Sequence, residues 1–66
     1  MIILTSLKGK EFYLNSELIY KIDKESDTII TLQDGMKIRV SDNPQEIIDK
    51  IIEYKRRIYL GVSEVD

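Results

Sequence analysis

The groups available for chemistry in this 66-residue chain are carboxylates, lysines, arginines, hydroxyls and tyrosines, because cysteine and histidine are both absent. Without cysteine the chain cannot form disulfides or thiolate zinc sites. Without histidine it lacks the usual general base near neutral pH. We therefore expect no enzymatic activity, no metal site and no cofactor.

Acidic side chains come nearest to a catalytic or metal-binding pattern. Asp49 and Glu53 lie one turn apart in a predicted helix, but two carboxylates on a solvated helix face are ordinary. Asp23, Glu25 and Asp27 superficially resemble a calcium loop, yet the glycine and the terminal bidentate glutamate of such a loop are missing. A charged hairpin turn is the simpler interpretation of these three residues.

Lys55, Arg56 and Arg57 form the densest basic cluster and are the candidate partner-binding residues. They could contact anionic lipid, nucleic acid or an acidic protein. A structural role explains them equally well, because cations near a helix C-terminus stabilise the helix dipole by about 0.3–1 kcal/mol each, and Glu53 can pair with Arg57. Lys55 falls inside the apolar stripe of the predicted helix, so it must extend to the margin or meet a counter-charge.

The elements that position these residues change type along the chain. The first forty residues alternate short apolar runs with turn residues, which predicts strands at 2–7, 11–14, 18–22, 28–33 and 36–40. Gly9 is free to take a positive φ in the first turn. Asp34-Gly35 predicts a type I′ hairpin turn with positive φ at both residues.

A helix is predicted over about 44–59. Asn43 can cap it, Pro44 occupies its first position, and Glu46 can complete a variant of the capping box. Gly61 is a plausible stop. One stripe of the helix is apolar, and its members are Ile47, Ile48, Ile51, Ile52, Tyr54, Ile58 and Tyr59. The fold class is therefore α+β: an antiparallel β-meander of four to five strands in residues 2–40, then one amphipathic helix, in a single domain of residues 1–60 with a short acidic tail at 61–66.

The strands carry isoleucine and leucine on both faces. One set comprises Ile2, Leu4, Ile22 and Ile30, and the opposite set, which is the candidate apolar face for an oligomer or partner, comprises Ile3, Leu7, Ile19 and Ile29. Because one helix cannot cover both sets, either the sheet curls into a small barrel or another copy or a partner buries the second face. A single core in so short a chain rarely supplies more than about 3–5 kcal/mol, which favours a homo-oligomer.

Charge and hydropathy indicate a chain that does not bind nucleic acid and does not insert into a membrane. The net charge is −2 and the pI is near 5.0, whereas nucleic-acid binders are usually strongly basic. The apolar start Met1-Ile2-Ile3-Leu4 is too short for a secretory signal, and no apolar run approaches the roughly 20 residues of a membrane span. We expect a cytoplasmic protein.

Several stretches together resemble the flagellar FlbD family, the short proteins also called swarming motility protein SwrD. The resemblance covers residues 1 to about 58 and is most specific in Leu4-Thr5-x-Leu7-x-Gly9 and Asp27-Thr28-x-Ile30-Thr31-Leu32. It implies a non-enzymatic accessory protein that supports swarming and the power of the motor's stator units. The implied partner is a flagellar motor or stator component, and the implied location is cytoplasmic and peripheral at the motor.

An RNA-binding regulator similar to the carbon storage regulator is the alternative. That family also has short β-rich chains that open with Met-x-x-Leu-Thr and end in a helix. It usually continues with Arg-Lys and places an arginine just before the helix, where this chain has Ser6-Leu7 and Asp42-Asn43. Without those cations, the release of counterions that dominates RNA affinity is weak.

Overall fold

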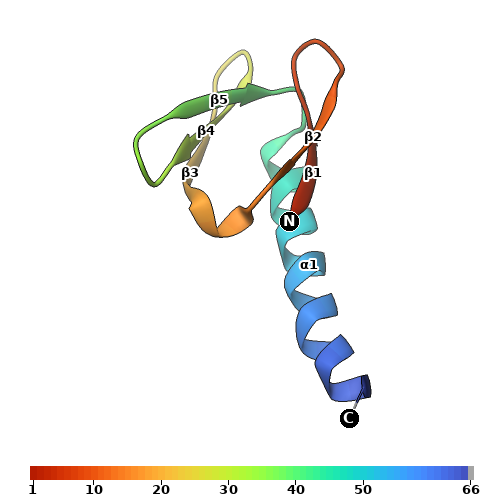
Figure 1. Ribbon diagram of the computed structural model, residues 1–66. Coiled ribbons are helices and arrows are strands. Elements are labelled where there is room, and N and C mark those ends of the chain that lie inside the picture. The colour runs from red at the N-terminus through yellow and green to blue at the C-terminus, as the bar shows by residue number, and fades with distance from the viewer. Residues whose placement is uncertain (66) are drawn as a thin grey trace.

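The computed structural model describes the backbone of residues 1–65 and the side chains of residues 1–58. Five strands and a short 3-10 helix precede one long α-helix, so the α+β fold is confirmed (Figure 1). The elements in chain order are β1 (Ile2–Thr5), β2 (Glu11–Leu14), η1 (Ser16–Leu18), β3 (Ile19–Lys24), β4 (Thr28–Leu32), β5 (Lys37–Val40) and α1 (Pro44–Val65).

The strands form two antiparallel sheets around one core. β1 pairs with β2, and β4 lies between β3 and β5 in the second sheet. An isolated bridge between Ser6 and Val40 joins the sheets, and the Ser41 N–H donates to the Thr5 carbonyl at 2.9 Å. The strands therefore follow the order β2, β1, β5, β4, β3, with the β1–β2 hairpin standing over the start of α1 (Figure 1).

Two tight turns share one geometry. Gly9 (φ 85°) and Gly35 (φ 91°) both lie in the left-handed region, and the N–H of each closes a four-residue turn by donating to Ser6 or Leu32. No other residue of the described chain has a positive φ, so the predicted type I′ turn at Asp34-Gly35 is wrong. Asp34 instead accepts the Met36 N–H on its side chain at 3.0 Å, which holds a three-residue loop of the kind that ends in a left-handed glycine.

The core is aliphatic and lies between the two sheets and the first turns of α1. Its buried members are Ile2, Leu4, Leu14, Ile30, Val40 and Ile47, and the half-buried residues packed against them are Phe12, Ile19, Ile22, Leu32, Ile38, Ile51 and Tyr54. Alternation along β1 and β4 places every second side chain inside, as the pattern of each strand predicts.

Strand β3 departs from the predicted alternation. Residues 16–18 form η1, capped by the Asn15 side chain, and the pairing register shifts between Ile19 and Lys21. An irregularity of this kind shifts the alternation by one residue, so Ile19 and Ile22 both pack against the core. The prediction that Ile19 faces away from the core is therefore wrong.

Ile29 lies on the outer face of the three-stranded sheet, as predicted, yet only 7% of it is exposed. It sits directly between Asp23 of β3 and Arg39 of β5 in the sheet register. The next outward row places Lys21 and Lys37 on either side of Thr31. Long charged side chains at these positions cover apolar surface with their stems, so this face needs no second copy to bury Ile29.

Helix α1 begins as predicted and runs farther than predicted. The Glu46 carboxylate accepts the Asn43 N–H at 2.9 Å, which is one half of the capping box. The backbone stays helical through Gly61 to Val65, so the predicted stop at Gly61 and most of the predicted tail at 61–66 are replaced by helix. A glycine costs a helix only about 1 kcal/mol relative to alanine, and no proline follows it. The C-terminal half of α1 projects beyond the strands (Figure 1).

Candidate functional site

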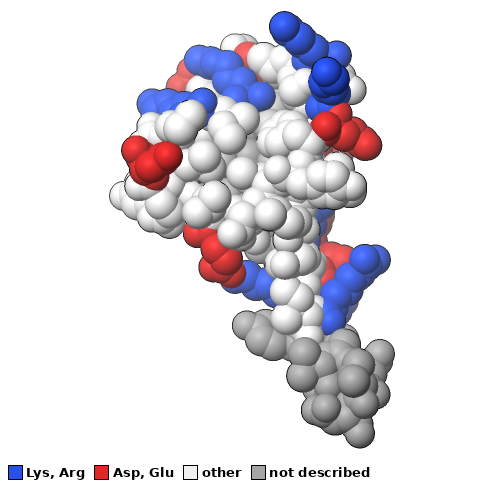
Figure 2. All heavy atoms as spheres, viewed as in Figure 1, with Lys and Arg blue, Asp and Glu red and all other residues white. Residues whose placement is uncertain are grey.

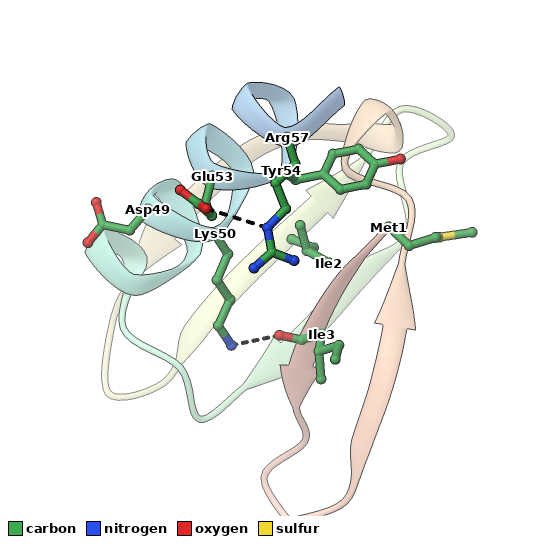
Figure 3. A pocket seen from close by; sticks show the side chains of 8 residues that line it. All are labelled: Met1, Ile2, Ile3, Asp49, Lys50, Glu53, Tyr54 and Arg57. Carbon is green, nitrogen blue, oxygen red and sulfur yellow. Dashed lines mark hydrogen bonds and ion pairs between the residues drawn. The ribbon is translucent and has the colours of Figure 1, made fainter. Parts of the chain in front are cut away.

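A groove lies between the N-terminal strand and α1. It has a volume of about 410 Å³ and is open along one side. Figure 3 shows the residues that line it, which are Met1, Ile2, Ile3, Asp49, Lys50, Glu53, Tyr54 and Arg57.

Simple geometry places these side chains in one groove. Lys50, Glu53, Tyr54 and Arg57 are spaced three or four residues apart, so successive turns of α1 present them on one side. That side faces β1, whose outer edge forms the other wall (Figure 3).

The outer edge of β1 is held in place by a buried carboxylate. Asp42 is 8% exposed, accepts the Thr5 N–H at 2.7 Å through Oδ1, and receives the Lys50 ammonium at 2.9 Å on Oδ2. Lys50 also donates to the Ile3 carbonyl at 2.6 Å. These contacts join β1 to Asp42, just before α1, and to Lys50 of α1, across 37 and 47 residues of sequence, so they hold the two walls of the groove together.

Burial alone raises the pKa of Asp42, but the hydrogen bond from the Thr5 N–H and the hydrogen bond and charge of Lys50 together outweigh it. The pKa of Asp42 therefore lies below the usual aspartate range. The carboxylate stays ionised at neutral pH, as an anchor for Lys50 requires. Nothing local in the sequence links Asp42 to Thr5, which lies 37 residues earlier.

The alternation of β1 turns the polar groups of Ile3 toward the side of the groove. The N–H and carbonyl of Thr5 bond to Asp42 and Ser41, so Thr5 does not bond to its partner in β2. In an antiparallel pair the bonded and non-bonded positions alternate, so the polar groups of Ile3 point the same way as those of Thr5. Lys50 donates a hydrogen bond to the Ile3 carbonyl, and by the same alternation the Ile3 N–H points to that side of β1.

The predicted basic cluster is not a single patch. Consecutive helical residues differ in direction by about 100°, so Lys55, Arg56 and Arg57 spread over about 200° of the circumference of α1. Figure 2 shows lysine and arginine on both sides of the helix. Arg57 faces the groove and pairs with Glu53 at 3.4 Å, as its spacing predicts. Lys55 and Arg56 are exposed, and within the side chains of residues 1–58 neither forms an ion pair.

The groove brings together one member of each predicted set. Ile3, from the candidate apolar face, lies opposite Arg57, from the basic cluster (Figure 3). Leu7 is 50% exposed but lies in the β1–β2 turn, outside the groove lining. Ile19 and Ile29 are covered within the chain itself, so the four residues do not form one exposed apolar face.

Comparison with protein families finds a match over nearly the whole chain. The model of the family described as flagellar and swarming motility proteins, FlbD, matches residues 1–59. The chain belongs to the FlbD family. Comparison with curated proteins and with solved structures gives no match.

In this FlbD family member the two helix carboxylates singled out in the sequence, Asp49 and Glu53, are engaged in local contacts. Asp49 accepts a hydrogen bond from Gln45 at 3.0 Å, and Glu53 pairs with Arg57. Among the described residues, no three acidic side chains lie close enough together to hold a metal ion. As far as the structure describes it, α1 also lacks the length of apolar sequence that would cross a bilayer.

The groove offers a ligand apolar side chains together with balanced charge. Its walls combine apolar side chains, one backbone amide, and equal numbers of cations and anions, namely Lys50, Arg57, Asp49 and Glu53. Balanced charge on an apolar floor suits a segment of another protein better than a small anion or a nucleic acid.

Proposed function

We propose that this FlbD family member is a non-enzymatic adaptor that supports swarming by contacting a component of the flagellar motor or its stator. The observation that carries the proposal is the family match over residues 1–59, which places the chain among flagellar and swarming motility proteins. The finer role, support of stator power through protein contacts, is our inference.

We further propose the groove between β1 and α1 as the docking surface. An extended segment of the partner would bury apolar side chains against Met1, Ile3 and Tyr54 and accept the Ile3 N–H on a backbone carbonyl. Charged groups flanking that segment would pair with Arg57 and Glu53, whose mutual pair is partly solvated. Lys50 and Asp42 position the wall and are already satisfied by each other.

The placement of the basic residues disfavours the RNA-binding alternative. RNA affinity depends on cations gathered along one surface, whereas Lys55, Arg56 and Arg57 point in different directions and Arg57 is paired. The net charge of −2 acts against binding as well.

A deletion strain complemented with variants tests the proposal. Wild type should restore the swarm expansion rate, and Ile3→Glu should fail to restore it, because a carboxylate would occupy the apolar wall. Ile3 is 42% exposed, so the fold tolerates the change. Met36→Glu is the matched control, since Met36 is 62% exposed in the β4–β5 loop and lies outside the groove lining.

Two measurements test separately the effect on stator power and the contact with a partner. Bead-rotation torque, measured with flagellar number held equal, reports stator power, and cross-linking from motile cells followed by pull-down reports the partner. A deletion strain that swarms normally would overturn the adaptor role. If Ile3→Glu complements as well as Met36→Glu, the groove is not the docking surface.

A further inference from the structure

The outward side of α1 carries exposed apolar residues that neither the core nor the groove uses. Ile48 is 42% exposed and Ile52 is 51% exposed. By helical geometry Ile52 points about 100° or more away from Ile47 and Ile51, which pack on the core, and Ile48 lies between Ile52 and that core side. Both point away from Arg57 in the groove. Exposed isoleucines in a helix that already has a buried stripe mark a second surface of α1.

Charged residues flank this second surface in a self-complementary order. Asp49 and Arg56 are seven residues apart, so they lie on nearly the same side of α1. Their midpoint falls beside Ile52. If a second α1 ran antiparallel across this point, Asp49 of each copy would lie opposite Arg56 of the other. Both residues are exposed, and Arg56 has no ion-pair partner within residues 1–58.

We propose that two copies of this chain associate through antiparallel α1 helices, with Ile48 and Ile52 at the centre and two Asp49–Arg56 pairs at the rim. The shape of the molecule agrees with this arrangement, because α1 projects beyond the strands in a particle of 44 × 24 × 18 Å (Figure 1). In the antiparallel pair the projecting half of each helix lies along the first half of the other. In a parallel pair Asp49 and Arg56 of one copy would lie on the opposite side of the interface from those of the other copy, so the Asp49–Arg56 pairs would not form.

This inference goes beyond the proposed adaptor role. Its apolar centre lies on a different side of α1 from Lys50 and Arg57 of the groove, and Asp49 lies at the margin of both surfaces. The interface has only two exposed isoleucines per copy, so the dimer should be weak. We expect it to be populated at protein concentrations of about 100 μM and above. Sedimentation velocity from about 1 μM to 1 mM measures it.

A charge exchange tests the antiparallel register directly. Asp49→Arg places two arginines opposite each other, and Arg56→Glu places two acids opposite each other, so each variant alone should weaken the dimer by at least about tenfold. An equimolar mixture of the two variants restores both pairs in a heterodimer and should associate as well as wild type. In a parallel pair Asp49 and Arg56 lie on the opposite side of the interface from their counterparts in the other copy, so the mixture would give no such restoration.

The apolar centre has its own variant and matched control. Ile52→Glu should abolish the dimer, whereas Leu7→Glu, at a similarly exposed leucine in a distant turn, should leave it unchanged. Circular dichroism shows whether each variant is folded. If Ile52→Glu does not fold, the mixture of Asp49→Arg and Arg56→Glu still tests the proposal. A wild type that remains monomeric at 1 mM overturns the proposal, as does a mixture that associates no better than its components.

Discussion

Removal of the Asp42 carboxylate should cost this small protein about half of its stability. Asp42→Ala deletes the acceptor of the Thr5 N–H at 2.7 Å and the partner of the Lys50 ammonium at 2.9 Å. Thr5 is partly buried, and β2 does not bond to its N–H, so the lost bond is not replaced within the sheet. The first expected effect is a loosened contact between β1 and α1.

The magnitude follows from the two contacts. A hydrogen bond to a charged group contributes about 1.5–3 kcal/mol. The Lys50 side chain is 38% exposed, so its pair with Asp42 is discounted to about 0–1 kcal/mol. We expect Asp42→Ala to lower the free energy of unfolding by about 2–3 kcal/mol, against a total of about 3–5 kcal/mol for a core of this size.

Urea titration followed by far-ultraviolet circular dichroism measures this loss, because the chain has no tryptophan. Asp23→Ala is the matched control: Asp23 is an exposed strand aspartate, 3.5 Å from Lys21, and should cost less than about 0.5 kcal/mol. The double variant of Asp42→Ala with Lys50→Met should cost less than the sum of the single variants, because the two residues contact each other.

An Asp42→Ala variant that unfolds at the same urea concentration as Asp23→Ala would refute this reasoning. Additive single and double variants would show that Asp42 acts through Thr5 alone and that Lys50 contributes nothing through it.

Four further predictions concern pH, turns, core and a buried hydroxyl. Because the folded-state pKa of Asp42 lies below its unfolded value of about 3.9, its stabilisation is present above that pH and is lost as pH falls through the folded-state pKa; the stability difference between wild type and Asp42→Asn should therefore shrink below about pH 4. Gly35→Ala should cost about 1–2 kcal/mol in urea titration through its φ of 91° alone, since nothing lies within 4 Å of the added Cβ. Ile47→Ala should cost about 2–5 kcal/mol and its neighbour Ile48→Ala less than about 1 kcal/mol at low protein concentration, because the first is fully buried and the second is 42% exposed. Thr28→Val should raise the melting temperature, because the Thr28 hydroxyl is buried without a hydrogen-bond partner among the described atoms.

Features that depend on near neighbours were predictable from the sequence. The apolar alternation located all five strands, and Gly9 marked a turn that needs a positive φ. Glu46 marked the start of α1, and its bond to Asn43 spans only three residues. The spread of Lys55, Arg56 and Arg57 around the helix also followed from local geometry alone, since adjacent helical residues always diverge.

The candidate groove was not predictable in the same way. Its walls come from β1 and from α1 about 50 positions later, and one of the contacts that hold them together joins Asp42 to Thr5. The residues near Asp42 and near Thr5 form no sequence pattern that predicts the contact between the two. The irregularity in β3 was equally hidden, because a shift of one residue in pairing leaves the composition of a strand unchanged.

The sequence by itself determined the order of the elements, the absence of cysteine and histidine, and the motifs that place the chain in the FlbD family. The tertiary structure decided which apolar residues remain on the surface. Charged neighbours from two other strands flank Ile29, a register shift turned Ile19 inward, and Ile3, Ile48 and Ile52 stayed exposed. The physical reason is that periodicity fixes only the direction of a side chain from its own strand or helix. Burial depends on what other segments place against it, and those segments meet only in the folded chain.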